Sequence, residues 1–178
     1  MTNESVFHKL LHAQIGNEFA ASQQYIAIAV YYDGIDMPRL ASYFYAQAVE
    51  ERNHAMMIVR HLLDRGIAVD LPGVAAPQTA FDDFRDPIEL ALTHEKTVTE
   101  QIVDLARTAR DEGDYLGEQF LQWFLSEQVE EVATMTTLHT IAERAQGNMF
   151  DVENFVRREM SGSEATTTNA PRAAGGNL

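Results

Sequence analysis

Four long stretches of this sequence carry no proline beyond their first turn and repeat apolar residues at helical spacing. Glycine, proline and capping residues mark their ends, which predicts helices over about residues 5–33, 38–65, 86–112 and 114–145. At about 1.5 Å per residue each helix would be about 40 Å long, well above the average for globular proteins. Helices of such matched length are typical of a bundle.

Two sequence signals mark helix starts. Asp36-Met37-Pro38 is typical of a cap followed by a first-turn proline, and Asp86-Pro87-Ile88-Glu89 combines a cap, a proline and an acid three residues on. We therefore expect Asp36 and Asp86 to cap the second and third helices.

The connections between these helices predict the topology. The first and last links are short, so each joins an antiparallel pair, whereas residues 67–85 contain Pro72, Gly73 and Pro77 and are long enough to cross the whole bundle. The second and third helices should therefore run parallel. A shorter helix follows over residues 149–160. Residues 161–178 read as a flexible tail rich in Ser, Thr, Ala and Gly, with nothing to bury.

Composition narrows the chemistry. The 178 residues suit one domain, and the absence of cysteine excludes disulfides, cysteine-ligated zinc, iron–sulfur clusters and a cysteine nucleophile. Any metal must be held by oxygen and nitrogen. A net charge of −14 argues against nucleic-acid binding and favours cations, although many acidic proteins bind neither. Without a signal sequence or an apolar run of about 20 residues, we expect a cytoplasmic protein without membrane contact.

Each long helix carries one acid on its apolar face: Glu18, Glu51, Glu95 and Glu131, with Glu127 adjacent. A single such acid more often marks a helix turned toward solvent. Four of them, buried and unpaired, would unfold a domain whose net stability is about 5–15 kcal/mol. No Lys or Arg shares these faces.

Two mechanisms would neutralise such acids. One is protonation, with strongly raised pKa values; the other, which we favour, is a pair of divalent cations. Glu51 and His54 form Glu-x-x-His and lie on one helical face, so the carboxylate can bridge two ions while the imidazole binds one. Carboxylate and imidazole ligands suit iron or manganese and do not exclude zinc.

Three segments carry a resemblance to a known family: NEFAASQQY, FYAQAVEERNHAMM and DEGDYLGEQFLQWFLSEQVEEV. Over residues 6–160 the chain resembles bacterial non-haem ferritins. The resemblance implies an all-α, ferritin-like four-helix bundle with one long crossover and a short fifth helix over residues 1–160, followed by the tail over residues 161–178.

The resemblance also implies a di-iron ferroxidase centre. Glu18, Glu51 and His54 would surround one iron, and Glu51, Glu95 and Glu131 the other, with Glu51 as the bridge. The centre would oxidise Fe(II) with O2 or H2O2.

Further positions match residues of the family around that centre. Tyr25 would hydrogen-bond a ligand and donate an electron, or else be a buried tyrosine with a satisfied hydroxyl. Gln128 matches a glutamine near the second iron. Glu50, Glu127 and Glu130 match the acids of a third iron site, although Glu50 and Glu130 read equally well as exposed helix acids.

Some positions depart from related families. Arg52 stands where bacterioferritins have a haem-ligating methionine, so haem is not expected, and a rubrerythrin would need cysteine. The family implies an octahedral shell of 24 identical subunits that stores a ferric oxyhydroxide mineral. The acidic turn Asp111-Glu112-Gly113-Asp114 would draw cations inward, or would only end one helix and cap the next. The tail would line the cavity or dock the protein to an outer encapsulating shell.

Three alternatives stay open on sequence alone. The first is a di-iron or di-manganese enzyme that forms no cage and stores nothing. The second is an interaction bundle without metal. The third is a miniature ferritin, which binds metal between subunits and lacks this four-helix set of acids.

Overall fold

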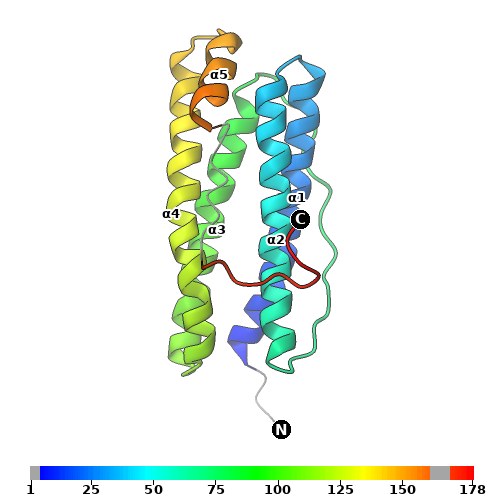
Figure 1. Ribbon diagram of the computed structural model, residues 1–178, viewed down its shortest axis with the longest axis vertical. Coiled ribbons are helices and arrows are strands. Elements are labelled where there is room, and N and C mark those ends of the chain that lie inside the picture. Colours follow the sequence, from blue (N-terminus) through cyan, green and yellow to red (C-terminus); the bar gives the residue numbers. More distant parts are fainter. Residues whose placement is uncertain (1–4, 161–168) are drawn as a thin grey trace.

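The computed structural model describes residues 5–160 and 169–178. Its elements are α1 (Val6–Gly34), α2 (Pro38–Asp64), α3 (Asp86–Asp111), α4 (Tyr115–Arg144), α5 (Met149–Phe155) and the π-helical turn η1 (Val156–Met160). These elements confirm the predicted all-α architecture of four long helices and a short fifth (Figure 1). Among the described residues, no helix combines the length and apolar character that crossing a bilayer requires.

The helices form a four-helix bundle with one long crossover. α1 packs against α2 and α3, and α3 packs against α4. Residues 65–85 run along the outside of the bundle from the end of α2 to the start of α3, which makes those two helices parallel (Figure 1). α5 and η1 contact both α4 and α2, and so bridge the pair of helices that have no short link between them.

The two predicted helix starts are wrong in detail. The residue before α2 is Met37, which makes no side-chain capping bond, and Asp36 takes a positive φ of 59° in the turn instead. Asp86 lies inside α3, and its carboxylate accepts hydrogen bonds from the backbone N–H groups of Asp82 (3.0 Å) and Asp83 (2.9 Å). It therefore orders the end of the crossover and leaves the helix without a side-chain cap, because the bend at residues 82–85 presents those N–H groups to it first.

The acidic turn between α3 and α4 is held by structural contacts. Glu112 accepts hydrogen bonds from the Ser5 hydroxyl (2.6 Å) and the Val6 N–H (2.8 Å), so it closes the first turn of α1. Asp114 caps α4 by accepting from the Gly117 N–H (2.9 Å). It also forms an ion pair with Arg65 (2.7 Å) at the end of α2. The predicted cap is confirmed for Asp114, whereas Glu112 binds the start of α1, a contact that the sequence did not indicate.

Apolar side chains form two clusters, one toward each end of the bundle. On α1 one cluster uses residues 7–15 and the other residues 25–32; on α4 they use residues 121–124 and 135–142. The buried acids fall between the two clusters on every long helix, at positions 18, 51, 95, 127 and 131. A polar layer therefore lies between two apolar ends.

Two glycines allow close packing around this bundle. A Cβ at Gly16 would lie 2.8 Å from the Pro72 ring, so the crossover approaches α1 only because no side chain is present. A Cβ at Gly117 would overlap the ring of Phe7, which fills the space between α1 and the start of α4.

Residues 169–178 lie against α2 rather than free in solvent. The Ala174 N–H donates to the Met56 carbonyl (3.0 Å), and the Leu178 N–H donates to the Asn53 side-chain oxygen (3.3 Å). Ala173 is buried and joins the apolar cluster that contains Phe7. For these residues the expectation of a tail with nothing to bury does not fit, because small side chains let the backbone approach the helix. Residues 161–168 of the predicted tail lie outside the described residues.

Candidate metal centre

The four inward acids occupy the polar layer, one from each long helix. Their exposed fractions are 1% for Glu18, 2% for Glu51, 0% for Glu95 and 6% for Glu131. The prediction that each helix turns one acid inward is therefore confirmed. Among the ion pairs of the described residues, none joins these four acids to Lys or Arg.

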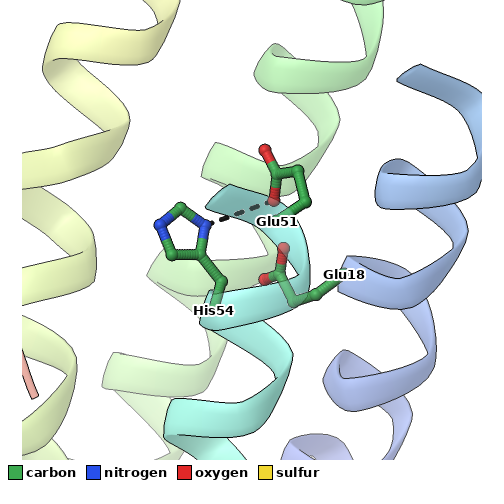
Figure 2. A group of neighbouring side chains, drawn as sticks. All are labelled: Glu18, Glu51 and His54. Carbon is green, nitrogen blue, oxygen red and sulfur yellow. Dashed lines mark hydrogen bonds and ion pairs between the residues drawn. The ribbon is translucent and has the colours of Figure 1, made fainter. Parts of the chain in front are cut away.

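Glu18, Glu51 and His54 form the tightest group. One ligand atom from each lies within 4.8 Å of the others, and all three residues are buried. Glu18 projects from α1, while Glu51 and His54 lie one turn apart on α2, with His54 Nδ1 3.2 Å from Glu51 Oε2 (Figure 2). The three side chains converge on one point between the helices, at a spacing that an ion with oxygen and nitrogen ligands can fill.

Neighbouring side chains hold this group in place. Gln14, one turn before Glu18 on α1, donates from Nε2 to Glu18 Oε1 (2.8 Å). Glu18 Oε2 is buried and has no hydrogen-bond partner among residues 5–160 and 169–178. The His54 ring meets Trp123 and Phe124 of α4 edge to face, with centroids 5.5 Å and 5.7 Å away. One oxygen of Glu18 and the imidazole are thus fixed, while the second oxygen points into the layer.

Glu95 is positioned from the other side of the bundle. The Tyr25 hydroxyl donates a hydrogen bond to Glu95 Oε1, and Glu95 Oε2 is buried without a partner in the described part of the chain. Thr99, one turn further along α3, donates to the Gln128 side-chain oxygen (2.8 Å). Gln128 of α4 is buried beside the same carboxylate, and its hydrogen bond acts to lower the pKa of Glu95.

Burial and mutual repulsion raise the pKa values of these acids. Burial, and then the charge of Glu51, raises the pKa of Glu18 to about 8. Burial and then the charge of Glu95 raise the pKa values of Glu51 and Glu131 well above the ordinary range. Burial also raises the pKa of Glu95, against the lowering effect of the Tyr25 hydrogen bond. The site is thus short of positive charge, and cations that bind there would release protons.

A second group lies beside the first. Ligand atoms of Glu50, His54 and Glu127 lie within 4.8 Å of one another. Burial and then the charge of Glu50 raise the pKa of Glu127. Glu130 is exposed and belongs to neither group.

Sequence reasoning missed several residues of this layer. His54 belongs to both groups, which spacing alone indicated only for the first, since Glu50 and His54 are also one turn apart. Gln14 and Gln47 each donate to an acid one turn away, at i+4 and i+3 spacing. Trp123 gave no signal, because an aromatic residue near a helix core usually serves packing alone. Glu95 and Glu131 lie in the layer but outside both groups.

Comparison with known proteins places this geometry in a family. The family described as "Ferritin-like domain" matches residues 8–145. Ferritin BfrB of Mycolicibacterium smegmatis is 61% identical over 100% of both chains. Ferritin BfrB of Mycobacterium tuberculosis is 58% identical over 97% of this chain and 94% of the relative.

More distant proteins agree. The bacterial non-heme ferritin of Staphylococcus aureus is 36% identical over 71% of this chain and 76% of its own. Among solved structures, an open pore ferritin from the hyperthermophilic archaeon Archaeoglobus fulgidus superposes with a TM-score of 0.82 at 27% identity, covering 89% of this chain and 100% of that one. The four-helix bundle with its layer of buried carboxylates, together with identity to named ferritins along its whole length, makes this chain a member of the ferritin family.

Proposed function

We propose that this protein is an iron-storage ferritin that oxidises Fe(II) at a di-iron ferroxidase centre within each subunit. The observation that carries the proposal is the polar layer, in which four buried carboxylates form no ion pair with Lys or Arg among the described residues. Their summed charge of about −4 equals, with opposite sign, that of two divalent ions. The family membership supports iron, here the substrate, over other divalent cations.

Each ligand has a part in this chemistry. Glu18, Glu51 and His54 hold one iron, and Glu51, Glu95 and Glu131 hold the other, with Glu51 shared. Carboxylate oxygens are hard donors that favour Fe(III) over Fe(II), so they make electron loss easier. Each Fe(II) gives one electron to O2, which takes up two protons to become H2O2; H2O2 itself is the alternative oxidant. Protons displaced from the acids when iron binds are a local source for this step.

Tyr25 and Gln128 assist the second iron. The hydrogen bond from the Tyr25 hydroxyl to Glu95 fixes one carboxylate oxygen and leaves the other free to bind metal. Tyr25 is also buried next to the centre, where it can supply an electron when only one iron is bound. Gln128 accepts a hydrogen bond from Thr99 and is itself a hydrogen-bond partner of the same acid.

A third iron position extends the centre. Glu50 and Glu127 would hold this ion together with His54, and Glu130 would join only if its exposed side chain turned inward. Because Glu50 and Glu127 are less buried than the four central acids, an ion here exchanges more readily with solvent. This position suits iron that is leaving the centre.

The oxidised iron needs a container. We propose that subunits assemble into a 24-subunit octahedral shell, and that ferric oxyhydroxide collects inside it. No role for haem is proposed, since Arg52 occupies the position of the haem-ligating residue. Residues 169–178 pack on their own subunit, which supports a lining role for the tail more than a docking tag for an outer shell.

An aerobic Fe(II) titration of the metal-free protein tests this function. Oxidised iron that stays in solution and co-elutes with the protein is measured as the iron-to-chain ratio rises, and the size of the assembly is measured in parallel. Uptake far above the few ions that the centre itself can bind, in a cage-sized particle, is the expected result. Uptake that stops at two ions per chain would indicate a di-iron enzyme without storage. No oxidation at all would contradict both.

A further inference from the structure

A stripe of polar side chains leads away from the centre along α2. Tyr43, Gln47, Glu50 and His54 follow one another at intervals of about one helical turn, so they line one face of the helix. His54 and Glu50 belong to the metal groups described above. Tyr43 and Gln47 have no part in the proposed oxidation.

Each of these two side chains buries a polar atom that has no hydrogen-bond partner in the described part of the chain. Gln47 is 8% exposed, and its Nε2 donates to Glu50 Oε2 (2.8 Å). That bond fixes the amide orientation, because the reverse would set two oxygens against each other. Gln47 Oε1 and the Tyr43 hydroxyl are both buried with no hydrogen-bond partner in the described residues. Buried polar groups are usually satisfied, so two such atoms one turn apart point to something that binds between them.

The charges around Tyr43 indicate whether that ligand is a cation or an anion. Burial raises the pKa of Tyr43 well above its ordinary range, and the four strongest charge effects on it all come from carboxylates: Glu131, Glu50, Glu95 and Glu51. The hydroxyl therefore lies within the negative electrostatic potential of the acids of the centre. A cation or its hydration water is favoured in this field, and an anion is not.

A pocket opens at the far end of the stripe. It has a volume of about 350 Å³ and is lined by Tyr43, by Ala133, Thr134 and Thr137 of α4, and by Phe155, Glu159 and Met160 of the C-terminal helical segment. Thr137 and Glu159 are exposed, so the pocket reaches solvent. Tyr43 thus lines this pocket and also lies in the electrostatic potential of the carboxylate layer.

We propose that Tyr43 and Gln47, together with Glu50, form a binding site for a hydrated iron ion, through which iron passes between the carboxylate centre and this pocket. The inference rests on the proposed function. Its donors are a phenol, an amide carbonyl and a carboxylate, all oxygen ligands that suit a hydrated cation. Without the imidazole that binds at the centre, the ion is held more weakly here and can move on. Water on the ion would satisfy both unpartnered atoms.

Two substitutions remove the proposed ligand oxygens, the Tyr43 hydroxyl and the Gln47 amide oxygen, with little change of shape: Tyr43→Phe and Gln47→Leu. Tyr45→Phe is the matched control, because Tyr45 lies on the same helix, is exposed, and donates to Asp33 instead (3.0 Å). The assembled metal-free protein receives one aerobic dose of Fe(II) sufficient to fill the centre, and a second dose after increasing delays. Two quantities are measured: the rate of the first oxidation, and the delay after which the second dose reacts as fast as the first.

The expected result is a selective delay. In Tyr43→Phe and Gln47→Leu the recovery time lengthens about tenfold more than the first oxidation slows, the factor that one hydrogen bond to a charged group provides. Tyr45→Phe behaves like the unaltered protein. Equal recovery in all four proteins, or equal slowing of both quantities, would overturn the transit site while leaving the proposed function intact. If the unaltered protein fails to oxidise iron, the proposed function itself is wrong.

Discussion

Two clusters in this molecule are both built from acidic side chains, but they have different roles. In the turn between α3 and α4, Glu112 and Asp114 are met by backbone N–H groups, a hydroxyl and Arg65. In the polar layer, Glu18 receives one hydrogen bond, from Gln14, while the nearest charges that act on Glu18 and Glu51 are those of other acids. The number of acidic residues in a cluster therefore does not identify a metal site. Buried acids whose oxygens lack donors do, because in the ionised form only an external cation can compensate their charge.

The pKa values express the same contrast. The hydrogen bond from the Ser5 hydroxyl lowers the pKa of Glu112. Burial acts to raise the pKa of Asp114, but the hydrogen bonds from Arg65 and Gly117 leave it below its ordinary value. In the polar layer, burial and repulsion raise the pKa of Glu18, Glu51, Glu95, Glu127 and Glu131. The partnered cluster stabilises the folded chain when ionised, whereas the central cluster destabilises it unless cations bind.

The largest effect is expected from Glu51→Gln. The substitution removes the bridging charge, so the first oxidation of Fe(II) should slow by at least about 100-fold. The metal-free variant should be as stable as the unaltered protein or more stable, because a repelled carboxylate is lost. Zn(II), which fills such sites without redox chemistry, should raise the melting temperature of the unaltered protein and not of the variant. Glu100→Gln on the exposed face of α3 is the control. Equal Zn(II) stabilisation of both proteins would mean that Glu51 binds no metal.

A pH dependence of stability is the next largest effect. Unfolded Glu18 loses its proton near 4.5, while the folded metal-free protein keeps it to about pH 8. Folding therefore takes up a proton in this window, and stability falls as pH rises, by up to about 1.4 kcal/mol per pH unit from this residue. Urea unfolding of metal-free protein between pH 5 and about 8 measures the slope, and Glu18→Gln should reduce it. A free energy of unfolding that rises with pH in this window, or an equal slope in Glu18→Gln, would contradict the raised pKa.

Asp114→Ala should affect stability and leave the first oxidation unchanged. The cap of α4 and the ion pair with Arg65 are both lost, which costs about 1–2 kcal/mol in the free energy of unfolding. Chemical denaturation at neutral pH and the stopped-flow oxidation rate are measured together, with Asp111→Ala, exposed in the same turn, as the control. A slower oxidation with unchanged stability would reverse the assignment and make this turn a path for cations.

The smallest effect is expected from Glu112→Gln. Its carboxylate is exposed, so solvent screens the charge. The two oxygens of Glu112 accept from Val6 and Ser5 separately; in the variant the amide oxygen keeps the bond from the Val6 N–H, while the amide NH2 group donates to the Ser5 hydroxyl in place of accepting from it. We expect a slight fall in melting temperature and no change in oxidation. A fall as large as that of Asp114→Ala would show that charge at this exposed position matters more than the hydrogen bonds it accepts.

Much of the fold followed from local patterns. Helical periodicity identified the four long helices, and one acid in the middle of each apolar face identified the polar layer. These features are readable because each depends on a single helix and its burial. Asp114 as a cap was likewise a local property, confirmed by its bond to Gly117.

The errors concern choices between partners. Asp86 matched a cap pattern, yet the bend before it offered Asp82 and Asp83 N–H groups instead. Ala173 gives no apolar pattern in a tail of small residues, yet it is buried because α2 lies beside it. The second role of His54 depends on Glu127 from another helix. Such facts arise only when distant segments meet, so spacing along the chain cannot supply them.

The two apolar clusters at the ends of the bundle have a mechanical consequence. Each end ties α1 to its neighbours through close-packed side chains, while the waist between them contains acids that repel one another when empty. Local fluctuations of this polar layer can therefore change the distances between metal ligands without loosening the apolar packing at either end. Bound iron would hold the central part of the bundle together and could be removed again. The backbone amides around Glu18 and Glu51 should therefore be protected from hydrogen exchange in proportion to how much iron is bound.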